Sequence, residues 1–205
     1  MAVTGRDRLI IYIVALLFST HPAFAMSSFS NMLTKSSSHM SASILKVASV
    51  PRDLGPSSKK IVQYSTSEKH GTIIISNSNR TLHYVLPGKR AEQYKISTGR
   101  DGFTWTGVTN VGRKAEWPDW RPPGEMKKRD PSLPDFVPAG PFNPLGARAV
   151  YLFKSNRDTL FRIHGTNNSR TIGEYETSGC FRLSNRDILE LYEKVRIGSK
   201  VIVND

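Results

Sequence analysis

The feature that most constrains the fold is a series of short runs rich in β-branched and aromatic residues, separated by turn-forming residues. The first four runs are residues 60–64, 72–76, 81–86 and 93–97. Residues 77–80 and the pair Pro87-Gly88 divide three of them in the way that turns divide the strands of a β-meander. Further runs follow at residues 149–153, 160–164 and 200–203. We therefore expect a mostly β domain of the sandwich or meander type.

One helix is predicted near the end of this domain. Ser184 stands three residues before Asp187, in the manner of a capping box. Apolar residues then recur at helical spacing, at Ile188, Leu191, Tyr192 and Val195. Because such a stripe normally packs against a sheet, we expect one late α-helix that covers the core and ends before Gly198.

The N-terminal 25 residues have the pattern of an export signal. Arg6 and Arg8 precede an apolar run at residues 9–18, and Ala23-Phe24-Ala25 provides a small-x-small cleavage pattern. The alternative is a retained membrane anchor, but ten apolar residues reach only about 15 Å as a helix, half the hydrocarbon thickness. We predict a signal peptide at 1–25 that is cleaved, and no stable membrane span after its removal.

The rest of the chain divides into a spacer and a folded domain. Residues 26–49 contain nine serines and no acidic residue, so we predict a flexible spacer over 26–70 and a domain over 71–204. Within that domain, the Pro-, Gly- and Trp-rich stretch 99–146 is too long for an ordinary connector. We expect it to form a lid or the wall of a cleft.

Charge and cysteine content restrict the partners and cofactors. Lys and Arg number 29 against 17 Asp and Glu, which gives a formal charge of +12 and favours an anionic partner or surface. The single cysteine, Cys180, excludes an intramolecular disulfide and a multi-cysteine zinc site. The sequence has no nucleic-acid motif and no cluster with metal-ligand spacing. We predict no metal, no cofactor and no nucleic-acid partner.

Cys180 is the best candidate for chemistry. It follows Gly179 in the run Thr177-Ser178-Gly179-Cys180, where a glycine allows a tight turn that presents backbone N–H groups. His164 ends a predicted strand and precedes a polar loop, so it could reach the cysteine and leave a thiolate–imidazolium pair. The alternative is a buried cysteine and a core histidine that never meet.

These residues lie in a longer pattern that resembles the catalytic motif of bacterial L,D-transpeptidases, which cross-link peptidoglycan through a cysteine. The similar segments are residues 164–167, Ile172-Gly173, residues 177–183, Asn185 and Asp187, and upstream of them 99–107, 117–123 and 143–148. Their order and spacing agree with the family over residues 71–203. The resemblance implies the family's mostly β fold, with the late helix beside the active-site cysteine.

The resemblance also implies roles for individual residues. Cys180 matches the nucleophile and His164 the general base, while Gly179, Ser178 and Gly165 match the oxyanion hole and its support. Many members carry a histidine immediately before the Gly-Cys pair, where this chain has Ser178, so Ser178 is not expected to transfer protons. The predicted substrate-binding residues are Arg182, Thr166 and Asn185; Arg182 would bind a substrate carboxylate or fix the cysteine loop.

The implied reaction is acyl transfer through a Cys180 thioester, from a peptidoglycan stem peptide to an amine. The acceptor could be a second stem peptide or an envelope protein, and an L,D-carboxypeptidase would use water. The implied location is the periplasm or cell envelope. The alternative from another class is a basic, non-catalytic peptidoglycan-binding protein in which Cys180 is structural.

Overall fold

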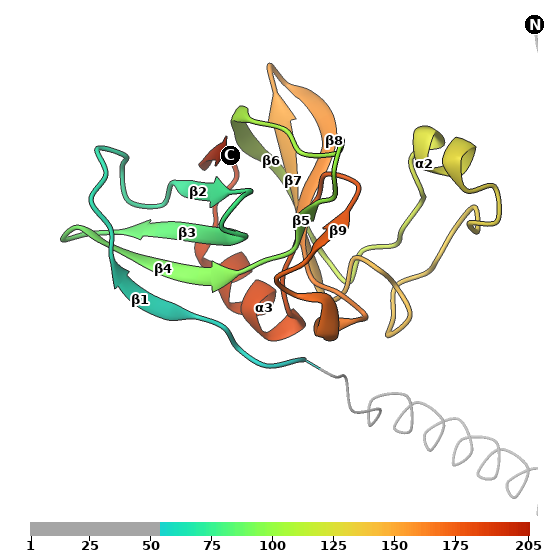
Figure 1. The fold of residues 1–205 in the computed structure, drawn as a ribbon, viewed down its shortest axis with the longest axis horizontal. Coiled ribbons are helices and arrows are strands. Elements are labelled where there is room, and N and C mark those ends of the chain that lie inside the picture. The colour runs from blue at the N-terminus through green and yellow to red at the C-terminus, as the bar shows by residue number, and fades with distance from the viewer. Residues whose placement is uncertain (1–53) are drawn as a thin grey trace, which may run out of the picture. The chain divides into compact units, whose positions relative to one another are not determined.

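A computed structural model describes residues 54–205, which form a mostly β domain (Figure 1). The predicted signal peptide and the spacer up to residue 53 lie outside the described residues. The strands are β1 Lys60–Gln63, β2 Ile73–Ser76, β3 Thr81–Leu86, β4 Arg90–Lys95, β5 Thr98–Gly99, β6 Gly107–Glu116, β7 Arg148–Lys154, β8 Arg157–His164, β9 Tyr175–Thr177, β10 Phe181–Arg182 and β11 Lys200–Asn204. The helices in this part of the chain are α2 Gly124–Arg129, a 3-10 turn Ser169–Thr171 and α3 Asn185–Lys194.

Nine of these strands form one mixed sheet in the order β1-β4-β3-β2-β11-β6-β7-β8-β10, and β5 pairs with β9 in a second, two-stranded sheet. Two antiparallel meanders, β2 to β4 with β1 added beside β4, and β6 to β8, are joined by β11, which is parallel to β2 and antiparallel to β6. One hydrophobic core contains residues of both meanders and of α3. The predicted mostly β fold is therefore confirmed, and its two halves belong to one continuous sheet.

Helix α3 forms as the sequence predicts. The Ser184 side chain accepts a hydrogen bond from the Asp187 amide at 3.1 Å, and Val195 is the C-cap. Ile188 and Leu191 are fully buried in the core. The helix therefore covers the sheet through the apolar stripe visible in its sequence.

The last part of the predicted spacer is folded, so that prediction is wrong from residue 54 onward. Leu54 O accepts from the Arg186 amide at 2.8 Å, and β1 pairs with β4. The Asp187 carboxylate, which is fully buried, accepts from the hydroxyls of Ser57 and Ser58, each at 2.7 Å. A buried carboxylate needs donors, and serines that look like a solvated spacer in the sequence supply them here.

The stretch 99–146 also differs from the prediction, because it contains the ten-residue strand β6 between β11 and β7. Its sequence, GVTNVGRKAE, lacks an apolar run. One of its polar side chains has a partner in the fold: the Lys114 ammonium lies over the Tyr192 ring and donates to Tyr192 O at 2.6 Å and Val195 O at 2.8 Å. After β6 the chain runs out to α2, which buries no residue (Figure 1).

Candidate active site

The pairing of β8 with β10 brings the predicted catalytic residues to one face. These strands run parallel, with Phe181 opposite Ile163 and Arg182 opposite His164. Phe181 and Ile163 are fully buried in the core. Because side chains alternate along a strand, His164 and Arg182 face the other side, and so does Cys180, two positions before Arg182. The thiol and the imidazole therefore lie on one face, with Cys180 two residues before the position opposite His164.

The histidine is held as a neutral base. His164 is 5% exposed, and its Nδ1 lies 2.6 Å from Gly165 O. A carbonyl oxygen only accepts, so Nδ1 carries the proton and Nε2 keeps its lone pair. Burial, the largest cause, and the positive charges of Arg182 and Arg162 together lower the pKa of His164 to about 3, against the opposing hydrogen bond to Gly165. The imidazole is therefore unprotonated at neutral pH.

The loop after His164 is fixed by Asn185, at the start of α3. Asn185 Oδ1 accepts from the amides of Ala147 at 2.9 Å and Thr166 at 3.1 Å, and Nδ2 donates to Thr166 O at 2.7 Å. A Cβ at Gly165 would lie 2.3 Å from Asn185 Oδ1, so only glycine fits. Thr166 is 3% and Asn185 7% exposed. These two residues, which are predicted to bind substrate, are buried and hold the loop that follows His164.

The cysteine is partly exposed and, at rest, is a neutral thiol. Its Sγ lies 3.9 Å from Leu160 O. Burial raises the pKa of the Cys180 thiol, against a backbone hydrogen bond from Arg162 and the charges of Arg162 and Arg182, which lower it. The same two guanidinium groups affect the pKa of His164, as expected if both groups share one site. The resting pair is thiol and neutral imidazole, and it differs from the predicted thiolate–imidazolium pair.

The turn before Cys180 is anchored by two aromatic side chains, Trp105 from the segment before β6 and Phe161 from β8. Gly179 has φ of +103°, and Trp105 Nε1 donates to Gly179 O at 3.0 Å. Trp105 stacks on Phe161 with ring centroids 4.6 Å apart, and a Cβ at Gly179 would lie 2.6 Å from the Phe161 ring. The Gly179 amide donates to Thr177 Oγ1 at 3.2 Å, so it is already used. Neither Trp105 nor Phe161 lies in the cysteine motif, so the sequence alone does not place either residue against this turn.

The Arg182 guanidinium has one hydrogen-bond donor without a partner among the described residues. Its Nη1 donates to Thr171 Oγ1 at 2.9 Å, while its buried Nε has no hydrogen-bond partner among residues 54–205. Burial lowers the pKa of Arg182, and the charges of Glu176 and Cys180 oppose this shift. An unpaired buried donor costs free energy, which an anionic ligand would recover.

Two surface cavities lie away from this site. Their volumes are about 620 and 220 Å³, and both are lined by Glu68 and His70. Lys194 and Lys200, which line the larger cavity, are paired with Glu190 and Glu68, each at 2.8 Å. Its cationic lining is therefore already partly neutralised.

Residues 54–205 contain no group of three or more His, Cys, Asp or Glu side chains that could hold a metal ion. The same residues include no helix that is long and apolar enough to cross a membrane.

Comparison with known proteins identifies similar chains. The model of the L,D-transpeptidase catalytic domain family YkuD matches residues 70–203. An Escherichia coli protein described as a probable L,D-transpeptidase, ErfK/SrfK, is 39% identical over 142 residues, which are 65% of this chain and 44% of that protein. A Bacillus subtilis protein named as a candidate L,D-transpeptidase, YqjB, is 30% identical over 65% of this chain and 70% of its own.

Solved structures agree on the fold. An L,D-transpeptidase from Mycobacterium smegmatis superposes with a TM-score of 0.52 at 18% identity, over 66% of this chain and 59% of that chain. The matched part of the Escherichia coli relative is less than half of its length.

Proposed function

Because this chain belongs to the L,D-transpeptidase catalytic domain family, a family of enzymes, we propose that it is a cysteine acyltransferase that acts on peptidoglycan stem peptides. Cys180 is the nucleophile and His164 the general base. The observation that carries this proposal is the face of β8 and β10 on which the thiol, the neutral imidazole and the Arg182 guanidinium lie together.

The first half-reaction forms a thioester. Cys180 Sγ attacks the carbonyl carbon of the L-to-D amide after the third stem residue, and its proton passes to His164 Nε2. The carbon–nitrogen bond breaks as His164 returns this proton to the departing amine of D-alanine. Because the resting thiol and imidazole are both neutral, we expect the proton to move as substrate binds and sulfur attacks.

The second half-reaction releases the acyl group. An acceptor amine attacks the thioester carbon, His164 takes the amine proton, and the sulfur leaves and regains a proton from His164. A second stem peptide as acceptor gives a cross-link, an envelope protein gives a protein attached to the wall, and water gives carboxypeptidase activity. Each acceptor uses the same two catalytic residues.

The surrounding groups complete the site. We assign an oxyanion donor to the Cys180 amide, since the Gly179 amide is already bonded to Thr177. Arg182, whose guanidinium lies on the same face, would bind a substrate carboxylate. Ser178 is half-buried next to the turn and supports it.

We also propose that the protein is exported to the periplasm or cell envelope. The predicted signal at residues 1–25 supports export, and the formal charge of +12 suits retention on an anionic envelope.

The decisive experiment uses muropeptides that carry tetrapeptide stems. The parent protein is expected to release D-alanine and form an acyl product identified by mass spectrometry, while Cys180→Ala should form none. A Cys180→Ala variant that is folded and as active as the parent would overturn the proposal.

A second test needs no acceptor. A carbapenem carries a strained acyl group, and an activated Cys180 should add to it and increase the intact mass by one inhibitor. Absence of an adduct on the parent protein, under conditions where iodoacetamide labels Cys180, would contradict an activated nucleophile.

A further inference from the structure

Strand β8 bulges next to the cysteine. Tyr151 of β7 lies opposite Arg162, and Phe153 lies opposite Asp158. One residue of β7 therefore faces three residues of β8, at positions 159–161. At the apex, Leu160 has φ of +63°, which is strained for a branched side chain, and its side chain is 57% exposed. A bulge of this kind redirects side chains at a functional site.

Asp158 closes this bulge with its carboxylate. Oδ1 accepts from the Leu160 amide at 2.8 Å and from Arg162 Nη1 at 2.6 Å, while Oδ2 accepts from Arg162 Nη2 at 2.8 Å. In a regular strand, residues four apart lie about 13 Å from one another. The bulge shortens the separation between Asp158 and Arg162, so their two parallel hydrogen bonds stabilise the bulged conformation.

The bulge in turn touches the nucleophile and its turn. Leu160 O lies 3.9 Å from Cys180 Sγ, and the Arg162 backbone is hydrogen-bonded to the same thiol. The Phe161 ring occupies the space that a Cβ at Gly179 would need. Three consecutive residues of β8 therefore define where the sulfur and the Gly179–Cys180 turn lie.

We infer that Asp158 is a positioning residue for the nucleophile, because its carboxylate holds the Leu160–Arg162 bulge against Cys180. This inference rests on the proposed function for its effect on acyl transfer, but the contacts themselves do not depend on it. Nothing in the cysteine or histidine motif includes Asp158, which lies six residues before His164.

The negative charge of Asp158 affects a quantity that can be measured, the pKa of the Cys180 thiol. The ionised groups that affect the thiol are Arg162 and Asp158 on β8 and Arg182 on β10; His164 is neutral, and Glu176 on β9 acts on Arg182. The Asp158 charge raises the thiol pKa. The Arg162 guanidinium also lies over the Tyr151 ring, 4.2 Å from its centroid, which should hold it in place without Asp158.

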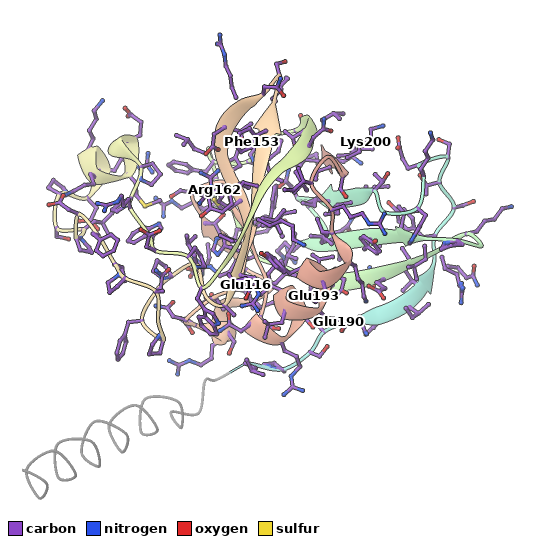
Figure 2. All side chains as sticks on the ribbon, turned by 180° about the vertical axis from the view of Figure 1, so that it is seen from behind. Glu116, Phe153, Arg162, Glu190, Glu193 and Lys200 are labelled. Carbon is purple, nitrogen blue, oxygen red and sulfur yellow. The ribbon has the colours of Figure 1, made fainter. Side chains whose placement is uncertain are left out.

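The test is Asp158→Ala, with Glu190→Ala as the matched control. Asp158 and Glu190 each pair with a cation four residues along, and their side chains are 35% and 36% exposed. Figure 2 shows Arg162 beside β7 and β8, away from Glu190 on α3. In Asp158→Ala the pH midpoint of Cys180 alkylation by iodoacetamide should fall, while acyl transfer should slow on the order of tenfold to a hundredfold because the sulfur is misplaced.

Each outcome decides the inference. A lower midpoint combined with slower transfer, both absent in Glu190→Ala, supports it if the urea unfolding midpoint of Asp158→Ala stays close to that of the parent, because partial unfolding would also expose the thiol and lower its pKa. Transfer within twofold of the parent, or an equal loss in Glu190→Ala, overturns it. If Asp158→Ala does not fold, Asp158→Asn decides: its amide oxygen keeps an acceptor for Leu160 but loses the charge, so an unchanged alkylation midpoint overturns the inference.

The experiments distinguish failure of the proposed function from failure of this inference. Alkylation needs no peptide substrate. If the parent protein transfers no acyl group, the proposed function fails, and the alkylation profiles of the two variants still test the position of the thiol.

Discussion

The two halves of the proposed catalytic pair are held in different ways. His164 lies in a buried polar network, in which Asn185 bonds both Ala147 and Thr166 and the imidazole bonds Gly165. Cys180 lies at the end of a turn that is partly exposed and held by aromatic packing. Buried hydrogen bonds are costly to break, whereas packing at a half-exposed turn tolerates small shifts.

This difference indicates how the reaction is divided between them. In the proposed reaction the histidine keeps one tautomer at rest and takes part in proton transfer in both half-reactions, so a fixed ring is useful. In the same proposed reaction the sulfur passes from thiol to tetrahedral adduct to thioester, so it needs a well-placed turn with room beside it. We expect changes on the histidine side to affect stability and chemistry together, and changes on the cysteine side to affect chemistry more.

The largest effect is expected for His164→Gln. Loss of the general base should lower kcat/KM for acyl transfer by about a thousandfold, within the usual range for such groups. The alkylation midpoint of Cys180 should change little, because the imidazole is neutral at rest. His70→Gln, which removes a comparable bond to Val85 O at 2.8 Å, is the control and should remain active. Activity of His164→Gln within tenfold of the parent would exclude His164 as the base.

On the same side, Asn185→Ala should reduce stability more than any change at the cysteine turn. It leaves the amides of Ala147 and Thr166 and the carbonyl of Thr166 without their partner, so a loss of about 3 kcal/mol in the free energy of unfolding is expected. Urea denaturation measures it. Exposed Asn79→Ala should cost less than about 0.5 kcal/mol, and equal costs for the two variants would contradict the network.

The buried histidine also predicts a dependence of stability on pH. The pKa of His164 is about 3 in the folded protein and about 6.5 in an unfolded chain. Between these values the unfolded chain binds a proton that the folded protein excludes, so stability falls as pH falls. From pH 7 to 4.5 the parent should lose on the order of 2 to 3 kcal/mol more than His164→Gln. Urea titrations at both pH values measure this; parallel losses would mean that His164 is not held neutral.

The sequence predicts elements whose stability is local. Strand β3 has the predicted bounds, and the cap and apolar stripe of α3 are as expected, because period and capping depend on neighbouring residues. Strand β6 was missed because partners from elsewhere in the chain, such as Tyr192 beneath Lys114, take up its polar side chains. Ser57 and Ser58 were assigned to a spacer because their partner, Asp187, lies 130 and 129 residues away.

The same distinction applies to the site. A compact motif identifies Cys180 and His164 as candidates, since thiol and imidazole chemistry follows from residue type. The directions of Thr166 and Asn185 do not follow from residue type, because hydrogen bonds between distant elements turn both inward. Trp105 and Asp158 lie outside the motif, and only the fold brings them to the cysteine turn.

The smallest effect is expected at the cysteine turn itself, from Trp105→Phe. Phenylalanine keeps the stacking on Phe161 but loses the hydrogen bond from Nε1 to Gly179 O. Stability should fall by about 1 kcal/mol, the usual net value of one hydrogen bond. Acyl transfer should slow about tenfold, because the turn sets the sulfur and the oxyanion donor together. Trp120→Phe, in the loop after β6, is the control and should change neither quantity by as much. The ratio of the loss in acyl transfer to the loss in the free energy of unfolding should be larger for Trp105→Phe than for Asn185→Ala. Equal ratios would contradict the proposed difference between the cysteine side and the histidine side of the site.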